Sequence, residues 1–108
     1  MGFFDLFRGI DINAGVETCR KTEGAVLLDV RSEAEYRSGH IPGSINVPVK
    51  NIEAVIKKIP DPDTPVYAYC VSGARSAKAV AVMKKMGYTD VRSIGGITRY
   101  TGERETSS

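Results

Sequence analysis

Apolar residues along this chain of 108 residues gather in two alternating kinds of segment. Strands are predicted over 25–30, 44–49, 66–71 and about 90–94. The continuous apolar run 25–30 is typical of a strand buried on both faces. Segments with apolar residues at helical spacing occupy about 12–21, 52–58 and 74–86. This alternation predicts an α/β domain with a mainly parallel central sheet of four to five strands, flanked by helices on both faces.

Several residues predict where helices begin and end. Asp11 or Asn13 is expected to cap the first helix, and Ser32 with Glu35 forms a capping box that starts a further short helix. Asn51 is expected to cap the helix over 52–58, whose inner face consists of Ile52, Val55, Ile56 and Ile59. Gly87 ends the helix over 74–86. Ala77, Val80, Ala81 and Lys84 form its predicted stripe, Val82, Met83 and Met86 lie beside it, and the two methionines are expected in the core.

The two ends of the chain differ from the segments between them. Residues 102–108 are short, polar and without periodicity, so we expect one domain over 1–101 followed by a disordered C-terminal tail. The N-terminal segment is apolar, with Phe3, Phe4, Leu6 and Phe7. We expect these side chains to fold back on the core, and a contact with a second copy or a membrane surface is the alternative.

Composition and charge narrow the class of protein. Apolar residues make up 42% and charged residues 26%, as in globular proteins, and the net charge of +2 is too small to argue for a nucleic-acid partner. Because no apolar run approaches about 20 residues and no export signal is recognisable, we expect a cytoplasmic protein without a membrane span. Cys19 and Cys70 are then expected to be reduced thiols, with Cys19 an inert core residue.

Cys70 carries the strongest chemical signal in the chain. It ends the apolar run 66–71, and a short loop containing Gly73 leads directly into the helix that begins near Ala74. A helix N-terminus presents unpaired N–H groups and a positive dipole end, which stabilise a thiolate. Arg75 adds a permanent positive charge. The loop is therefore predicted to be an anion-binding site with a nucleophilic cysteine. Ser72 and Ser76 are each expected to donate a hydroxyl hydrogen bond there.

Four segments in the same order resemble the rhodanese family of sulfurtransferases. They read LLDVR (27–31), EYRSGHIPGSINVP (35–48), CVSGARS (70–76) and GGI (95–97), and together they extend over most of 26–100. The most specific is GHIPG followed by a strand. The chain departs from the family by lacking a tryptophan after the glycine pair, and Tyr100 is expected to fill that space.

The resemblance implies a reaction and assigns residues to it. Members carry sulfane sulfur as a cysteine persulfide, taken from a donor such as thiosulfate and passed to cyanide or a thiol, in some cases through a sulfur-relay protein. Cys70 would be the carrier, within a binding loop of Val71, Ser72, Gly73, Ala74, Arg75 and Ser76. Asp29 and Arg31 would form an ion pair that braces this loop. The resemblance implies no cofactor, and no set of residues has the spacing of metal ligands.

Two other functions stay open. Cysteine phosphatases and arsenate reductases also combine a cysteine with an arginine, but five residues separate the two in phosphatases, against the four between Cys70 and Arg75. The smaller ring suits one extra sulfur atom better than a phosphate. A module that accepts sulfur only from a protein partner is the second alternative. His40, the single histidine, is expected to hydrogen-bond loop backbone rather than act as an acid or base.

Overall fold

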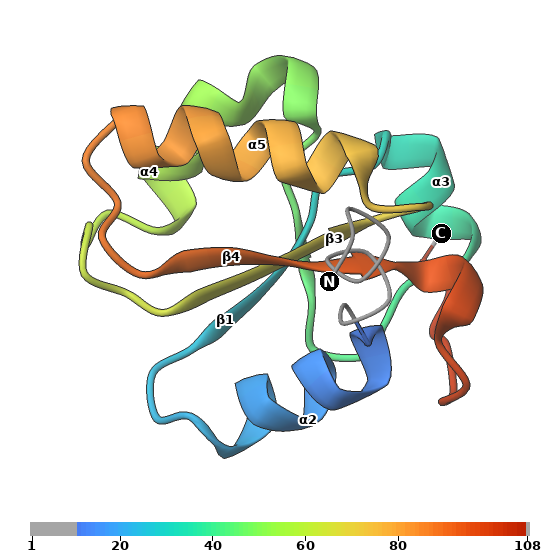
Figure 1. Ribbon diagram of the computed structural model, residues 1–108. Helices are drawn as coiled ribbons and strands as arrows, with labels where there is room; N and C mark the ends of the chain where they lie inside the picture. Colours follow the sequence, from blue (N-terminus) through green and yellow to red (C-terminus); the bar gives the residue numbers. More distant parts are fainter. Residues whose placement is uncertain (1–10, 108) are drawn as a thin grey trace, which may run out of the picture.

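A computed structural model describes residues 11–107, which form a four-stranded parallel sheet between two layers of helices (Figure 1). The strand order is β2-β1-β3-β4. The strands are β1 Val26–Asp29, β2 Ile45–Asn46, β3 Val66–Cys70 and β4 Val91–Gly96. All three pairings are parallel, so the carboxyl ends of the strands meet at one edge. The predicted α/β fold and parallel sheet are confirmed.

Helices cover both faces of the sheet and close its carboxyl edge. One face carries α5 (Ala74–Lys85), α4 (Val55–Lys58) and the 3-10 helix η1 (Val49–Ala54). The other face carries α2 (Ile12–Lys21). Figure 1 shows α3 (Glu33–Ser38) at the end of the sheet where the strands finish. The short 3-10 helix η2 (Ile97–Arg99) directly follows β4 at the same end.

The core has two halves because successive side chains of a strand point to opposite faces. In β3, Val66, Ala68 and Cys70 pack with α4 and α5, whereas Tyr67 and Tyr69 pack on the α2 side. All five β3 residues are buried. A continuous apolar run in the sequence therefore corresponds to a strand covered on both faces.

Three predicted helix boundaries are confirmed. The Asp11 side chain accepts a hydrogen bond from the N–H of Asn13 at 2.9 Å and caps α2. Both hydrogen bonds of the Ser32–Glu35 capping box are present at the start of α3. Gly87 follows Met86, the C-cap residue of α5. Its φ of 107° is a left-handed conformation that favours glycine.

Two helix predictions are wrong. Asn51 does not cap a helix, because it lies inside η1 with φ −120° and ψ 29°. The 3-10 turns there have three residues per turn, which rotates the following residues and leaves Ile56 57% exposed. On α5 the buried face is also rotated from the predicted stripe. Of that stripe only Val80 is buried, together with Ser76 and Ala79, which were not predicted. Met83, expected in the core beside the stripe, is buried as predicted.

The C-terminal segment is paired with the domain. The backbone of Glu105 exchanges two hydrogen bonds of 2.8 Å with His40, and the N–H of Ser107 donates to the carbonyl of Arg37 at 2.9 Å. This arrangement differs from the disordered tail expected from composition, because backbone pairing does not require apolar side chains. The domain boundary at residue 101 stays a prediction. The N-terminal phenylalanines lie outside the described residues.

Candidate active site

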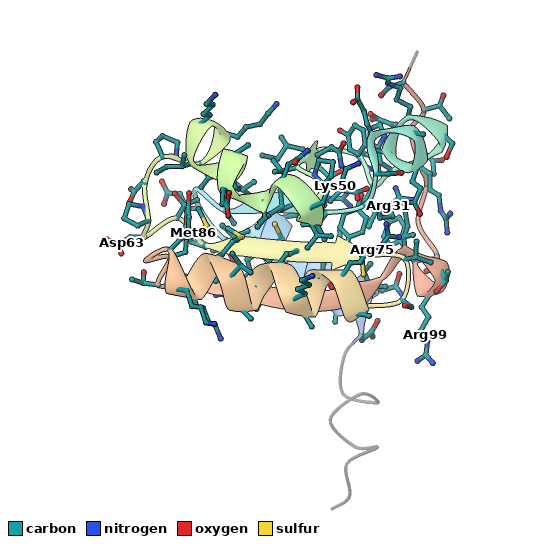
Figure 2. All side chains as sticks on the ribbon, turned by 90° about the horizontal axis from the view of Figure 1, so that it is seen from above. Arg31, Lys50, Asp63, Arg75, Met86 and Arg99 are labelled. Carbon is teal, nitrogen blue, oxygen red and sulfur yellow. The ribbon has the colours of Figure 1, made fainter. Side chains whose placement is uncertain are left out.

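The predicted site residues come together at the carboxyl edge of the sheet. Asp29 ends β1, Cys70 ends β3 and Gly96 ends β4. Ligands of open α/β sheets bind outside this edge. The position supports the predicted site, and Figure 2 shows Arg31 and Arg75 close to it.

The sulfur of Cys70 lies within a small cradle of N–H groups. The side chain is 1% exposed, and its Sγ accepts hydrogen bonds from the N–H of Gly73 at 3.0 Å and of Ser76 at 3.3 Å. Gly73 has φ of 108°, which a residue with a side chain rarely adopts. This turn directs the backbone N–H groups at the start of α5 toward the sulfur.

The cradle determines the acidity of the thiol. Burial alone would raise the pKa of Cys70. Hydrogen bonds from the backbone and hydroxyl of Ser76, and from the N–H groups of Gly73 and Ser72, outweigh burial and lower the pKa. The thiolate, which is the nucleophilic form, is therefore favoured in this position.

Ser93 extends the cradle and was not identified from the sequence. The Ser76 Oγ lies 3.6 Å from the Cys70 Sγ, 3.0 Å from the carbonyl oxygen of Gly73 and 2.7 Å from the Ser93 Oγ. Ser93 also accepts from the N–H of Gly95 at 3.4 Å. In the sequence, only its position two residues before the glycine pair could have indicated a role for Ser93. Its contact with Ser76 depends on how β4 lies beside α5.

The glycine pair lets β4 approach the loop closely. A Cβ added at Gly96 would lie 2.1 Å from the carbonyl oxygen of Val71 and 2.6 Å from the Cα of Ser72. The same carbonyl accepts from the N–H and hydroxyl of Thr98 at 3.3 and 3.2 Å. The end of β4 and η2 therefore support the loop from one side.

Arg75 is held by a carboxylate of α3. Its guanidinium donates to Glu35 through two hydrogen bonds of 2.8 and 3.0 Å, which lower the pKa of Glu35 to about 2. Glu35 is also the carboxylate of the capping box. The loop arginine thus joins the start of α5 to the start of α3.

The Asp29–Arg31 ion pair is present and buried. Arg31 donates to the Asp29 carboxylate at distances of 2.7 to 3.1 Å and to the carbonyl of Gly39 at 2.6 Å. Its exposed fraction is 5% and that of Asp29 is 0%. Through Arg31 the pair reaches the backbone after α3, at the Gly39 carbonyl. The expectation that the pair braces the Cys70 loop stays a prediction. The guanidinium lies 5.8 Å from the centre of the Tyr69 ring, next to Cys70 in sequence.

The side chains of Ser72, His40 and Tyr100 do not contact the Cys70 sulfur. Ser72 is exposed and acts on the sulfur through its backbone N–H, so the predicted hydroxyl hydrogen bond is replaced by a backbone one. His40 stacks on Tyr36, and its Nδ1 donates to the carbonyl of Tyr36 at 2.8 Å, so its side chain contacts the backbone of helix α3 rather than the predicted loop backbone. Tyr100 packs partly buried against the α2-side core.

A cavity of about 680 Å³ lies beside the loop. Residues 72–74 and Ala77 form one wall, Ser93 and the glycines 95–96 form another, and Thr98 with Arg99 lies at the η2 side. Gly73 and Ser93 thus belong both to the sulfur cradle and to the cavity wall. Among residues 11–107, no three His, Cys, Asp or Glu side chains gather as a metal site requires, and no helix is long and apolar enough to cross a membrane.

Known proteins match this chain over most of its length. The family model for the rhodanese-like domain matches residues 16–103. Thiosulfate sulfurtransferase PspE of Escherichia coli is 37% identical over 71 residues, which are 65% of this chain and 68% of that protein. The putative sulfur carrier protein YrkF of Bacillus subtilis is 33% identical over 97 residues, which are 89% of this chain but only 52% of YrkF.

A solved structure agrees with both the fold and the sequence match. A structure described as rhodanese with anions from E. coli is similar with a TM-score of 0.71 and 31% identity, over 76% of this chain and 98% of the other. The parallel sheet and flanking helices are therefore those of the rhodanese fold. Together with the family match, they show that this chain belongs to the rhodanese-like sulfurtransferase family.

Proposed function

We propose that Cys70 carries sulfane sulfur between a small donor such as thiosulfate and an acceptor such as cyanide or a thiol. The observation that carries this proposal is the sulfur cradle, in which the N–H groups of Gly73 and Ser76 point at the Cys70 Sγ. A persulfide is anionic like the thiolate, so the same N–H groups stabilise the resting and the loaded enzyme. The names of relatives such as PspE, a thiosulfate sulfurtransferase, support the same assignment.

The proposed reaction has two steps that balance in atoms and charge. The Cys70 thiolate attacks the outer sulfur of thiosulfate, an S–S bond forms as the donor's S–S bond breaks, and sulfite leaves with the electron pair. Cyanide or a thiolate then attacks the terminal sulfur of the persulfide and releases the Cys70 thiolate. We invoke no general base, because the lowered pKa of Cys70 increases the fraction of the thiolate, which is the attacking form.

The position of Arg75 supports sulfur transfer over phosphate or arsenate chemistry. A phosphate needs an arginine that donates to its oxygens, but both terminal nitrogens of Arg75 already donate to Glu35. The four-residue spacing also makes a smaller ring than the phosphatase loop. We therefore propose Cys70 and residues 71–76 as the persulfide site, with Asp29 and Arg31 as structural support.

Intact mass spectrometry tests the proposal directly. After incubation with thiosulfate, the wild-type chain should gain the mass of one sulfur atom, and cyanide should remove it with release of thiocyanate. Cys70→Ser should gain nothing, whereas Cys19→Ser should behave like the wild type. A wild-type chain that gains no sulfur from thiosulfate or from any persulfide donor would overturn sulfur transfer by this protein.

A sulfur-relay role is the second candidate, favoured by the similarity to the putative sulfur carrier protein YrkF. In that case a protein partner, rather than thiosulfate, loads Cys70. Loading by a cysteine desulfurase with cysteine, and negligible turnover with thiosulfate and cyanide, would favour the relay. Rapid turnover with the small donor would favour the enzyme.

A further inference from the structure

One face of the sheet carries almost all the lysines of the chain. Of the seven lysines, six lie on η1, α4 and α5, and all six are exposed. This set, which we call the basic face, consists of Lys50, Lys57, Lys58, Lys78, Lys84 and Lys85. Within residues 11–107 none of the six forms an ion pair, and Glu53 is the single acidic residue on these three helices. The positive charge of this face is therefore not neutralised by the described fold.

The opposite face of the sheet has a more balanced charge. On α2 the Lys21 ammonium pairs with the Glu17 carboxylate at 2.8 Å, and Arg20 donates to the carbonyl of Pro42 at 3.2 Å. The helix dipole favours the lysines in the last turns of α4 and α5. It does not account for Lys50 and Lys78, which lie in the first halves of η1 and α5. The gathering of lysines on one face therefore needs another explanation.

The outward side of α5 begins at the Cys70 loop. Ala74, Lys78, Ala81 and Lys85 follow one another at intervals of four, three and four residues, so they lie along one side of the helix, and all four are exposed. The first of them directly follows Gly73, which belongs to the sulfur cradle. A partner that covers this side of α5 therefore lies beside the loop.

Lys50 lies near the same edge of the sheet on η1. The N–H of the preceding residue, Val49, donates to the carbonyl of Val30 at 3.0 Å, directly after the end of β1. Figure 2 looks onto the basic face and shows Lys50 on the side of Arg75 and away from Met86. The basic face therefore extends from the loop along both η1 and α5.

Ile56 adds apolar contact surface to the basic face. Among residues 11–107 it is the one large hydrophobic residue that is exposed, with 57% of its surface accessible, and it precedes Lys57 on α4. An apolar contact surrounded by polar and charged residues is typical of protein interfaces. The three helices carry no aromatic residue on which a nucleic-acid base could stack. One isoleucine is also too little apolar surface for insertion into a membrane. These features favour a protein partner.

We propose that the basic face docks an acidic segment of a protein partner. Its Asp or Glu carboxylates pair with the exposed lysines, and an apolar side chain among them packs on Ile56. This inference goes beyond the proposed function, because thiosulfate and cyanide do not need a surface of this size. Exposed lysine pairs are individually weak and are screened by salt, so the partner binds reversibly.

A fluorescent peptide of repeated Glu-Glu-Leu-Glu units tests the docking, and the matching Gln-Gln-Leu-Gln peptide is its neutral control. Fluorescence anisotropy at low salt should show the acidic peptide bound about tenfold more tightly than the neutral one, and high salt should remove most of this difference. Lys78→Glu combined with Lys85→Glu should weaken binding of the acidic peptide about tenfold, because two exposed attractions become repulsions. Ile56→Ser should weaken it about threefold through the lost apolar contact.

A matched double variant on α2 separates a local effect from an effect of net charge. Arg20→Glu combined with Lys21→Glu changes the net charge by the same amount on the opposite face, and it should leave the affinity for the acidic peptide unchanged. Equal weakening by the two double variants would overturn the basic face as the docking site, as would equal binding of the acidic and neutral peptides to the wild type.

Two further anionic probes test the class of partner. Single-stranded oligo(dT) and phosphatidylglycerol vesicles should bind more weakly than the acidic peptide, and Ile56→Ser should not weaken the binding of oligo(dT). Tighter binding of either probe than of the acidic peptide would overturn the assignment to a protein partner. All of these measurements are made without a sulfur donor, so a chain that forms no persulfide would contradict the proposed function and leave the docking surface standing.

Discussion

The two cysteines of this chain are both buried, but their surroundings shift their acidity in opposite directions. Cys19 lies on α2 in the core half formed with Leu27 and Tyr67, and burial raises the pKa of its thiol. Cys70 is buried more deeply, yet its pKa is lowered. The difference lies in the N–H and O–H donors around the sulfur of Cys70. Burial makes a thiol inert unless the structure also supplies hydrogen bonds to its anion.

The largest expected effect is in the reactivity of the two thiols. In the folded protein at neutral pH, iodoacetamide should label Cys70 and leave Cys19 unlabelled, whereas unfolding in guanidinium should expose both. Because the pKa of Cys70 is lowered, its labelling rate should begin to fall at a lower pH than the labelling rate of an ordinary exposed thiol. Peptide mapping of the labelled protein across pH measures both rates. Equal labelling of Cys19 and Cys70 in the folded protein would contradict the predicted difference in their reactivity.

Gly96→Ala should deform the cradle and make Cys70 resemble Cys19. The backbone of Gly96 has φ of −125°, which any residue adopts, so the clash of the new Cβ with Val71 is the cause. We expect persulfide formation to slow about 100-fold, as for a misplaced reacting group, and a loss of about 1–3 kcal/mol in the free energy of unfolding. Stopped-flow kinetics and urea unfolding measure these effects.

Gly39→Ala is the matched control, because a Cβ there meets only the Arg104 side chain at 3.9 Å. Gly39→Ala should therefore keep the wild-type rate of persulfide formation. If Gly96→Ala also kept that rate, close support of the loop by β4 would not be needed for reactivity.

Ser76→Ala should remove part of the stabilisation of the thiolate. Loss of its hydroxyl is expected to raise the pKa of Cys70, because a hydrogen bond that stabilises the thiolate is removed. Ser93→Ala should raise it less, because Ser93 acts by orienting the Ser76 hydroxyl. Thiolate absorbance against pH measures the order of the two effects. Ser72→Ala removes an exposed hydroxyl and should not raise the pKa of Cys70. If it raised that pKa as much as Ser76→Ala does, the Ser76 hydroxyl would not be a specific stabiliser of the thiolate.

The smallest expected effect comes from the Glu35–Arg75 pair. Both side chains are more than one third exposed, so Arg75→Gln should cost about 0.5–1 kcal/mol of unfolding free energy at neutral pH. The pKa of Glu35 is lowered to about 2, so this stabilisation is complete above the unfolded value of about 4.3 and is lost as the pH falls toward 2.

Urea unfolding of wild type and Arg75→Gln across this pH range measures the difference. A difference that stays constant down to pH values near 2 would contradict the assignment to Glu35. Arg75→Gln should also raise the pKa of Cys70 less than Ser76→Ala does. A larger increase would make the arginine, and not the N–H cradle, the main difference between the two cysteines.

Local signals predicted much of this fold because they depend on neighbouring residues. The apolar runs of β1 and β3, the capping box at Ser32 and the left-handed Gly87 were all identified correctly. The loop from Cys70 to Ser76 was also located, since the strand, the glycine and the helix follow one another in the chain. Ile56 was misplaced because a 3-10 turn changed the period on which the prediction relied.

The contacts of the loop were not predictable in the same way. Arg75 meets Glu35 across 40 positions of sequence, and Ser76 meets Ser93 across 17. Nothing near either residue in the chain indicates its partner. Each contact follows from the order in which β1, β3 and β4 lie side by side and bring their carboxyl ends to one edge.

A strand that ends in a cysteine and turns through Gly73 into a helix already defines a reactive thiol, because backbone N–H groups at a helix N-terminus are a local consequence of the chain. What surrounds that thiol is decided by the tertiary structure. The packing of α3 places Glu35 where it pairs with Arg75. The close contact between Gly96 and the loop backbone brings Ser93 and Arg99 beside the loop. Hydrogen bonds and charges act over a few ångströms in space, and only folding places residues this far apart in sequence within that range.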